Sequence, residues 1–541
     1  MIDKNDLHPG DTRNSVNRPP GQDLRFTYYS DIDDSYQPYA LYIPSKYDSR
    51  RSWPVVINLH GTSAGWSEEF TGQTSEHYSA EENAAPLFAA EQYGAILLTP
   101  FGRGVTEFRG IGENDLFRAL QQLKHSYSID GEKISITGLS MGGTGASEIA
   151  LHRPNLFSAV APIGAAYSFP WLAANGMHLP FWCIGGQNDP NFHVGGKLVA
   201  EAMIKRNYPT RLDIREGRYH SDFVPEYYNR IFPWLVRYRR IARPNKYVFS
   251  ALMPTYGRSY CTSIEAIESP GKVGTLKVDI SRDSVYTLTT DNISCLSVFP
   301  YDLVKKGHDF VIVEIDGERT FEGIVNSQQE IWLEKGLNSW DGNLASRRAH
   351  SITDYRTRPI GSSARSLVME GLDSPMARWI SDAMRIATGA DLAIYNRRHY
   401  RGLPIPKGTV DEIDLIQCSR PFEEYLALVY LSGRDIVNIV EDNLREDAGY
   451  EYVIQPSGFR YTFSWDRPLG TRLTNIDVDT GRTYLVALEG QVFNRRTLYL
   501  AGRESRLDVC VTDVPLCGAL YAHVVRTGKV IAPQGRRIWA V

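Results

Sequence analysis

The segment ISITGLSMGGTGASEIALHRP, residues 134–154, decides the fold of the first part of the chain. A short apolar run ends at Leu139, a helical pattern begins at Met141, and Ser140 lies between Gly138 and Gly142. Because glycine tolerates sharp turns and close backbone approach, the segment predicts a strand that turns directly into a helix. The Ser140 hydroxyl would then be exposed at the top of the strand, above the helix N-terminus.

A second match to Gly-x-Ser-x-Gly, GTSAG at residues 61–65, makes Ser63 a competitor. The chain has 45 glycines in 541 residues, so the bare pattern is a weak signal. After Ser63 comes the polar, unpatterned stretch AGWSEEFTGQTSEHYSAEE, in which no packed helix is expected. We therefore assign Ser63 to a loop and Ser140 to the reactive turn.

Residues 25–243 alternate apolar runs of strand length with amphipathic helical patterns. The runs are WPVVINLH, GAILLTP, KISITGL, AVAPIGA, PFWCIGG and RLDIREG. Strands that are apolar throughout and alternate with helices indicate a mostly parallel sheet covered on both faces. The predicted class of this region is α/β.

A nucleophilic serine needs a base, and the base needs a carboxylate that orients it. Asp189 follows the run PFWCIGG and His220 follows RLDIREG, so both are expected at the carboxyl edge of the sheet with Ser140. The sequence therefore predicts the triad Ser140, Asp189 and His220. The competitors are His193, Asp213 and Asp222. His193 is too near Asp189 in sequence to come from a separate loop. Asp213 lies within a strand, and Asp222 lies beside His220 itself.

The negative oxygen of a tetrahedral intermediate needs N–H donors. Met141 follows the nucleophile and Thr62 follows the first long strand, so their backbone N–H groups are the expected pair. His60 is expected to brace that loop by hydrogen bonding. The aromatic residues Trp66, Tyr167, Trp171 and Trp182 are candidates for an acyl or aryl pocket, although simple packing explains such residues more often.

The runs QPYALYIPSKYDSRRSWPVVINLHG, TPFGRG, IGENDL and SIDGEKISITGLSMGGTGASEIALHRPNLFSAVAPIGA resemble those of α/β-hydrolase esterases. The resemblance is to the polyhydroxyalkanoate-depolymerase and feruloyl-esterase branch, related to prolyl-oligopeptidase-like hydrolases. It implies carboxylic ester hydrolysis through an acyl-enzyme, with Ser140, Asp189 and His220 as the triad. The chain departs from the family in having GRY before His220, where a glycine is usual.

The later regions have other patterns. Residues 245–340 carry alternating strand patterns without helices, which indicates a small antiparallel β domain resembling a sandwich. The polar segment 341–365 is expected to be a linker. Residues 366–541 are expected to form an α+β domain, while residues 1–24 are expected to be an N-terminal extension.

The α+β region resembles the C-terminal domain of 5'-nucleotidases. The resemblance rests on SPMARWISDAMRIATGADLAIYNRR, IPKGTVDEIDLIQCSRPFEEYLALVYLSGRDIVNIVEDN and QPSGFRYTFSWDRPLGTRLTNIDV. A nucleotidase also needs a metallophosphatase domain with clustered metal ligands, and the sequence shows no such cluster. Asn396-Arg397-Arg398 replaces the usual Asn-Gly-Gly. Phe459 and Tyr461 are candidates for stacking a planar ligand, with packing on a strand face as the favoured interpretation.

Composition limits the function classes. A net charge of −4 gives no basic field for nucleic acid or an anionic membrane, and no apolar run is long enough to span a bilayer. The polar first residues do not predict a secretion signal. The six cysteines are scattered, which favours buried free thiols over a Cys510–Cys517 pair. We expect a cytoplasmic protein with no cofactor or metal; self-association stays open.

The favoured hypothesis is a serine carboxylesterase that acts on a small-molecule ester. The first alternative keeps the triad in a peptidase or amidase. The second alternative is a nucleotide- or sugar-binding protein that acts through its C-terminal domain.

Overall fold

The computed structural model describes most of the chain in two units. Unit 1 comprises residues 1–267 and 274–355, and unit 2 comprises residues 268–273 and 356–541. Within the described residues, no helix is long and apolar enough to cross a membrane. The described residues are 20–62, 80–104, 106–167, 170–301, 308–348, 358–397, 400, 402–418, 425–445, 452–490 and 508–541.

The first part of unit 1 is an eight-stranded sheet with the order β1-β2-β4-β3-β5-β6-β7-β8. The strands β1 and β2 form an antiparallel hairpin and β2 pairs antiparallel with β4, while β3 to β8 are parallel. The mostly parallel sheet predicted from the sequence is confirmed. The strands are β1 Asp23–Ser30, β2 Ser35–Tyr42, β3 Trp53–Leu59, β4 Ile96–Pro100, β5 Ile129–Leu139, β6 Ala159–Ile163, β7 Phe181–Gly186 and β8 Thr210–Arg215.

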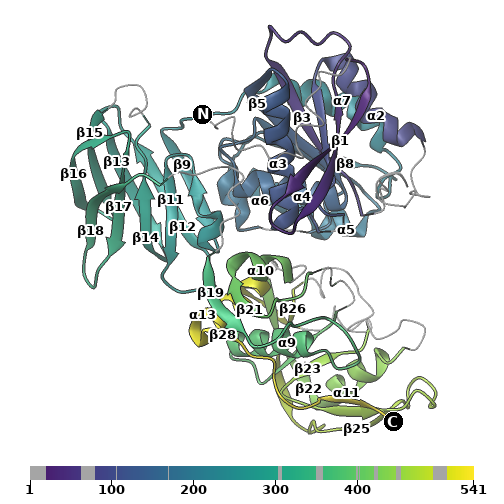
Figure 1. Ribbon diagram of the computed structural model, residues 1–541. Helices are drawn as coiled ribbons and strands as arrows, with labels where there is room; N and C mark the ends of the chain where they lie inside the picture. Colours follow the sequence, from purple (N-terminus) through teal and green to yellow (C-terminus); the bar gives the residue numbers. More distant parts are fainter. Residues whose placement is uncertain are drawn as a thin grey trace. The chain divides into compact units, whose positions relative to one another are not determined.

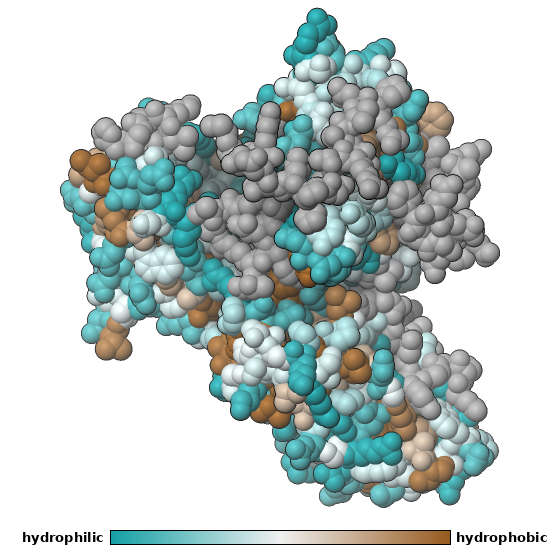
Figure 2. Space-filling model, viewed as in Figure 1, coloured by the Kyte–Doolittle hydropathy of each residue, from teal (hydrophilic) through white to brown (hydrophobic). Residues whose placement is uncertain are grey.

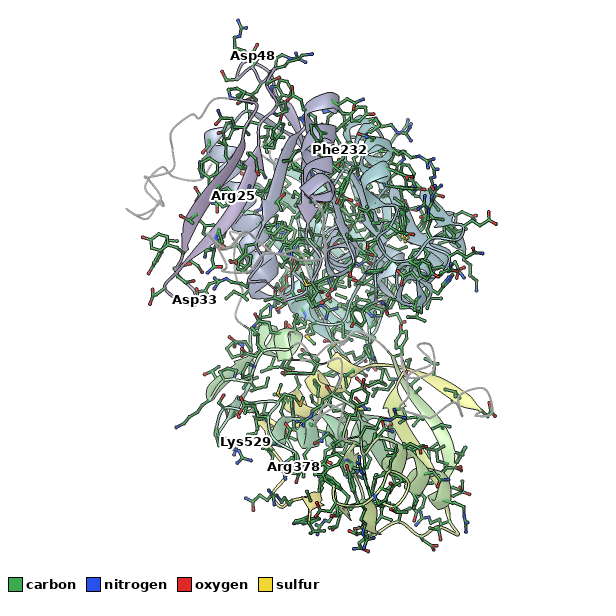
Figure 3. All side chains as sticks on the ribbon, turned by 90° about the vertical axis from the view of Figure 1, so that its right-hand side faces the viewer. Arg25, Asp33, Asp48, Phe232, Arg378 and Lys529 are labelled. Atoms are coloured by element: carbon green, nitrogen blue, oxygen red, sulfur yellow. The ribbon has the colours of Figure 1, made fainter. Side chains whose placement is uncertain are left out.

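Helices cover both faces of this sheet (Figure 1). On one face α2 and α7 pack together, and the core there includes Phe232 of α7, which is fully buried (Figure 3). On the other face α4 packs on β5 and β6. The helices are α2 Ala80–Tyr93, α3 Ile111–Ser126, α4 Met141–His152, α5 Pro190–Val194, α6 Gly196–Ile204 and α7 Val224–Arg237.

The rest of unit 1 consists of two five-stranded sheets that share one apolar core. Their orders are β10-β11-β14-β17-β18 and β16-β15-β13-β12-β9. All pairs are antiparallel except β13 with β15, which is parallel because the intervening β14 lies in the other sheet. The strands are β9 Lys246–Ala251, β10 Arg258–Ser259, β11 Thr262–Ile267, β12 Gly274–Ile280, β13 Val285–Asp291, β14 Ile293–Val298, β15 His308–Ile315, β16 Glu318–Asn326, β17 Gln329–Lys335 and β18 Trp340–Ser346.

The segment 341–365, predicted to be a linker, differs from that expectation at both ends. Strand β18 pairs with β17 over its full length, and β19 (Pro359–Ser363) pairs with β21 (Gly408–Asp411) in unit 2. Most of β18 is exposed, with Trp340 as its buried residue. An edge strand of this kind lacks the apolar alternation by which strands are recognised in a sequence.

Polar contacts join the hydrolase sheet to the β-sheets within unit 1. Asn175 in the short helix η2 (Leu172–Gly176) donates from Nδ2 to the Ser250 carbonyl at 3.0 Å and accepts from the Ser250 N–H at 2.7 Å. Tyr256 in η3 (Pro254–Tyr256) donates to Glu113 of α3 at 2.9 Å. Buried amide and hydroxyl groups therefore find partners across this junction.

Unit 2 is an α+β domain with a five-stranded sheet, β23-β20-β26-β22-β27, and two three-stranded sheets, β21-β19-β28 and β25-β24-β29. Helix α9 (Pro375–Thr388) begins after the cap Ser374, whose side chain accepts from the Ala377 N–H, and ends at Gly389 with φ +65°. On the face drawn in Figure 2, apolar residues of this unit lie in small groups among polar ones. The remaining elements are α10 Glu412–Cys418, α11 Gly433–Asp442, α13 Leu516–Thr527, β20 Leu392–Tyr395, β22 Tyr425–Ser432, β23 Gln455–Ser457, β24 Tyr461–Phe463, β25 Leu473–Ile476, β26 Thr483–Glu489, β27 Val509–Pro515, β28 Lys529–Val530 and β29 Ile538–Ala540.

All six cysteines lie in the described part of the chain, and none of them forms a disulfide there. All are buried except Cys510 on β27, which is exposed and so departs from the expectation of buried thiols.

Candidate active site

Ser140 is the single residue between β5 and α4. Its φ of 57° and ψ of −114° place it in a region that a non-glycine residue rarely adopts. Its N–H donates to the Ile163 carbonyl at 2.9 Å, and its carbonyl accepts from the Thr144 N–H at 2.9 Å. Such a conformation costs on the order of 1–3 kcal/mol and is retained where the surroundings impose it, often at functional sites.

The glycines beside Ser140 allow the turn to lie against neighbouring strands. A Cβ atom at Gly142 would lie 2.0 Å from the Leu59 carbonyl oxygen, and one at Gly143 would lie 2.3 Å from the Ile163 carbonyl oxygen. Neither backbone oxygen can move away easily. The sharp strand-to-helix turn predicted from the sequence is therefore present, and α4 starts directly against β3 and β6.

Asp189 and His220 form a hydrogen-bonded pair. Nδ1 of His220 lies 2.6 Å from Oδ2 of Asp189, and Oδ1 of Asp189 accepts from the Asn191 N–H at 2.9 Å, which caps α5. Asp189 is buried, with 1% of its side chain exposed, whereas His220 is 34% exposed. A carboxylate oxygen accepts hydrogen bonds, so this contact is compatible with the tautomer of His220 that carries its proton on Nδ1.

The imidazole of His220 lies beside the end of β6, where the Ile163 carbonyl accepts the Ser140 N–H. A Cβ atom at Gly164, directly after β6, would lie 3.2 Å from Cε1 of His220. Gly164 has φ +55°, so this position has neither the conformation nor the space for a larger residue. Gly164 was not singled out in the sequence, although its place immediately after the run AVAPI was a signal for it.

The loop after β3 adjoins the start of α4, as an oxyanion site requires. The carbonyls of Leu59 and His60 both lie against Gly142, and Thr62 is exposed two residues further on. The N–H of Met141 belongs to the first turn of α4, where N–H groups have no acceptor within the helix. The positions of Thr62 and Met141 are therefore compatible with the predicted oxyanion role.

His60 occupies a bracing position. Its Nδ1 lies 2.9 Å from the Gly61 carbonyl and its Nε2 lies 2.9 Å from the Phe101 carbonyl. Burial lowers the pKa of His60 below its usual value, which favours the neutral ring. The ring ties the loop after β3 to the end of β4, in agreement with the interpretation drawn from the sequence.

The competitors for the triad have other contacts. Asp213 accepts from the Tyr227 hydroxyl at 2.9 Å, and Asp222 accepts from the Tyr219 N–H at 3.0 Å. Nε2 of His193 lies 2.7 Å from the Gln187 carbonyl. Ser63 and Trp66 lie outside the described residues.

Two of the candidate pocket aromatics lie away from Ser140. Trp171 contacts His152 at the last residue of α4, with ring centroids 6.0 Å apart, while Ser140 precedes the first residue of that helix. Twelve residues of helix separate these ends by roughly 18 Å. Trp182 lies near the start of β7, at the opposite edge of the sheet, and packs on Tyr227 and Trp234. These positions do not favour a pocket role for Trp171 or Trp182, and that role stays an untested prediction.

Tyr167 remains a candidate by position. It lies in the segment after β6, on the carboxyl edge of the sheet, and it is 3% exposed. Its role in substrate binding stays a prediction.

The candidate ligand-stacking residues of unit 2 are packed in its core. Phe459 is 3% and Tyr461 is 1% exposed, and the Tyr461 hydroxyl donates to the Ile454 carbonyl at 2.7 Å. This confirms packing as the better interpretation. Arg397 is 7% exposed, so this cation fills protein interior where a glycine was usual, and Arg398 lies outside the described residues. No group of three or more metal-ligating side chains occurs in the described part of the chain.

Two family matches follow the two units. Residues 101–234 match the Dienelactone hydrolase family, and residues 356–496 match the family described as 5'-nucleotidase, C-terminal domain. The first match includes Ser140, Asp189 and His220. It supports a hydrolase of ester substrates.

The solved structures that are similar to this chain include a 5'-nucleotidase and esterases. A 5'-nucleotidase precursor from Thermus thermophilus is 18% identical with a TM-score of 0.31, over 43% of this chain and 54% of that one. A thermostable esterase is 21% identical with a TM-score of 0.34, over 40% of this chain and 63% of that one. A ferulic acid esterase is 18% identical with a TM-score of 0.34, over 40% of this chain and 98% of that one. The chain thus spans less than two thirds of the first two proteins. Its own polypeptide joins an α/β-hydrolase domain, similar to the Dienelactone hydrolase family, to a 5'-nucleotidase C-terminal domain.

Proposed function

We propose that the protein is a serine carboxylesterase with Ser140, Asp189 and His220 as its catalytic triad. The observation that carries the proposal is the 2.6 Å contact between His220 and the buried Asp189. This pair lies at the sheet edge where Ser140 adopts its strained turn. The family match at residues 101–234 supports the same class of reaction.

In the proposed mechanism, Nε2 of His220 accepts the Ser140 proton as Oγ attacks the ester carbonyl carbon. Asp189 holds the ring in the required tautomer and stabilises the imidazolium that forms. The N–H groups of Thr62 and Met141 donate to the oxyanion. His220 then protonates the leaving alcohol, and water, activated by His220, hydrolyses the acyl-enzyme to release the acid and restore Ser140.

The test is turnover of a nitrophenyl acetate by the Ser140→Ala variant. We expect a loss of about six orders of magnitude, as for removal of the nucleophile in other triads. Ser147→Ala is the matched control, because Ser147 is buried in the same helix and its hydroxyl has no hydrogen-bond partner within the described ranges. Near wild-type turnover by Ser140→Ala would overturn the proposal.

We further propose that the substrate is an aryl, feruloyl-type or short-chain acyl ester. A panel of short-chain, long-chain and hydroxycinnamate esters measures the acyl preference. Nitroanilide amides of the same acyl groups separate an esterase from the alternative peptidase or amidase. If kcat/KM for amides equalled that for the esters, the esterase assignment would be replaced by the amidase one.

A further inference from the structure

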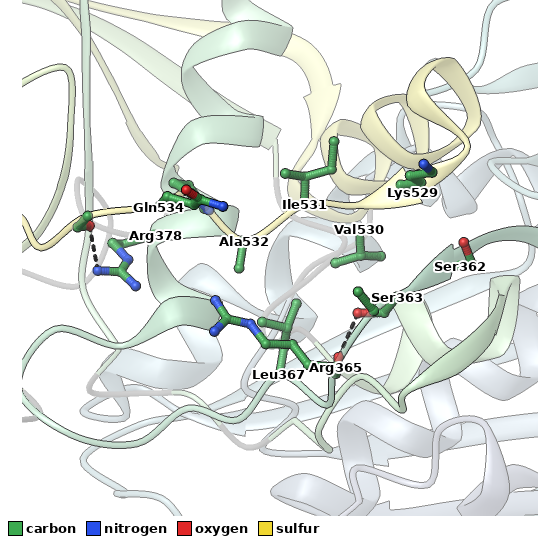
Figure 4. Close-up of a pocket in the computed structure, with 13 residues that line it drawn as sticks. Ser362, Ser363, Arg365, Leu367, Arg378, Lys529, Val530, Ile531, Ala532 and Gln534 are labelled. Carbon is green, nitrogen blue, oxygen red and sulfur yellow. Dashed lines mark hydrogen bonds between the residues drawn. The ribbon is translucent and has the colours of Figure 1, made fainter.

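Unit 2 contains a pocket of about 700 Å³ that the proposed esterase reaction does not use. It is formed by the end of β19 and the residues after it, the first turn of α9, and β28 with the segment that follows (Figure 4). All of these elements belong to unit 2. The volume is in the range of sites for small organic ligands.

The charge of the pocket is cationic. Arg365, Arg378 and Lys529 line it, and its lining includes no Asp or Glu (Figure 4). Arg365 and Lys529 are exposed, and no ion pair is formed by either within the described residues. Two cationic groups are therefore available to a bound anion.

Arg378 supplies an independent sign of a missing partner. It is 8% exposed, and its NH1 donates to Oδ2 of Asp373 at 2.9 Å and to the Gly535 carbonyl at 2.7 Å. Among the described residues, its buried Nε has no hydrogen-bond partner. A buried donor left without a partner is costly, and native proteins rarely keep one. Asp373 offsets part of the Arg378 charge, so the attraction for an anion rests mainly on Arg365, to which Lys529 adds positive charge from the other side of the pocket.

The rest of the lining is mainly apolar, with Ser362, Ser363 and Gln534 as its polar residues. Leu367 and Val530 are buried, and Ile531 is 54% exposed beside them. These side chains offer little to a fully hydrated inorganic ion. They fit the body of an organic molecule, because apolar area removed from water stabilises binding.

We propose that this pocket binds a small organic anion, with its carboxylate or phosphate monoester toward Arg365 and Arg378 and its apolar body against Leu367 and Val530, while Lys529 adds positive charge from the other side of the pocket (Figure 4). Binding is independent of the Ser140 chemistry. The C-terminal domain is then a ligand-binding module in its own right.

Isothermal titration calorimetry on the full chain tests the proposal. The probes are benzoate, phenyl phosphate, inorganic phosphate and the neutral benzyl alcohol. We expect saturable binding of benzoate or phenyl phosphate at submillimolar concentration, and at least tenfold weaker binding of inorganic phosphate and benzyl alcohol. Whichever of the first two binds more tightly identifies the anionic group.

The variant Arg365→Gln/Lys529→Gln should weaken binding of the preferred probe about tenfold or more, because it removes both exposed charges. The matched control is Lys407→Gln/Arg434→Gln, which removes two exposed cations of unit 2 that do not line the pocket. The control should bind within twofold of wild type. Both variants should retain ester turnover, so that a failure here is distinct from a failure of the esterase proposal.

Three results would overturn the inference. The first is that neither benzoate nor phenyl phosphate shows saturable binding up to several millimolar. The second is that the pocket variant and the control bind the probe equally well. The third is that benzyl alcohol binds as tightly as benzoate, which would show an apolar site without anion recognition.

Discussion

His152 is the last residue of α4, whereas His220 lies beside Gly164, near the other end of that helix. The two histidines have opposite surroundings. Near the N-terminus, His220 is partly exposed and contacts the buried Asp189 at 2.6 Å. At the C-terminus, His152 is 2% exposed and stacks on Tyr256, with ring centroids 3.9 Å apart. Burial and the charges of Arg153 and Arg109 hold the pKa of His152 well below its usual value.

The difference fits the proposed role of His220 as the base and gives no such role to His152. His220 contacts a buried carboxylate through Nδ1, and 34% of its side chain is exposed. His152 lies among arginines and an aromatic ring, where protonation is disfavoured. One end of the helix is suited to proton transfer, while the other joins the hydrolase domain to Tyr256 of the β-sheet part of unit 1.

The largest expected effect contrasts the two histidines directly. His220→Ala should lower ester turnover about a million-fold, since base and nucleophile act as a unit. His152→Phe keeps an aromatic ring against Tyr256 and should change kcat less than tenfold. Steady-state kinetics on both variants measure this contrast, and equal losses would contradict the assignment of the base.

Asp189→Asn should have the next largest effect. The amide no longer selects the tautomer of His220, and we expect kcat to fall about ten-thousand-fold with little change in stability. Kinetics combined with circular dichroism separate these two properties. A loss of less than tenfold in the folded variant would show that another group orients His220.

In the C-terminal half of α4, Glu148 forms a buried ion pair with Arg109. We expect this pair to affect the free energy of unfolding. Arg109 Nε lies 2.8 Å from Glu148 Oε2, and the two side chains are 4% and 3% exposed. Arg109→Met leaves a buried carboxylate without its cation and should cost about 3–5 kcal/mol in urea unfolding at pH 8. Arg109→Met/Glu148→Leu should recover most of the loss.

The loss of unfolding free energy in Arg109→Met should be smaller at acidic pH. Burial raises the pKa of Glu148 to about 7, so below that pH the carboxyl is neutral and needs a cation less. Urea unfolding of Arg109→Met at pH 6 and pH 8 measures the difference. An equal cost at both values would contradict the expected change in the charge of Glu148 between them.

The smallest expected effect is the pH dependence that His152 imposes. Its folded pKa is depressed, so the unfolded chain binds the proton first, and stability is lost as pH falls below about 6.5. The slope from this one group is about 1.4 kcal/mol per pH unit. The unfolding free energy of wild type should fall more steeply than that of His152→Phe between pH 6.5 and 5.5, and parallel curves would contradict this.

The sheet edge was predictable because its residues follow local patterns. The apolar runs before Ser140, Asp189 and His220 predict where three strands end, and parallel strands bring those ends together. The distance of the aromatic side chains from this sheet edge could not be predicted in the same way. Trp171 lies at the far end of α4 because of contacts with residues distant in sequence, which no local pattern records.

Unit 2 shows the same limit. Its strands and helix α9 follow from apolar periodicity and from the cap at Ser374. The pocket lined by Arg365, Arg378 and Lys529 joins segments more than 150 residues apart. Exposed cations carry no periodic signal, so only the folded arrangement reveals it.

Covalent labelling with a fluorophosphonate tests the central claim most directly. The reagent forms a stable bond with a serine only where a neighbouring base and oxyanion donors activate it. We expect one adduct per chain, located on Ser140 by tandem mass spectrometry, absent in Ser140→Ala and strongly slowed in His220→Ala. An adduct on Ser63, or ester turnover that continues after complete labelling of Ser140, would contradict the account.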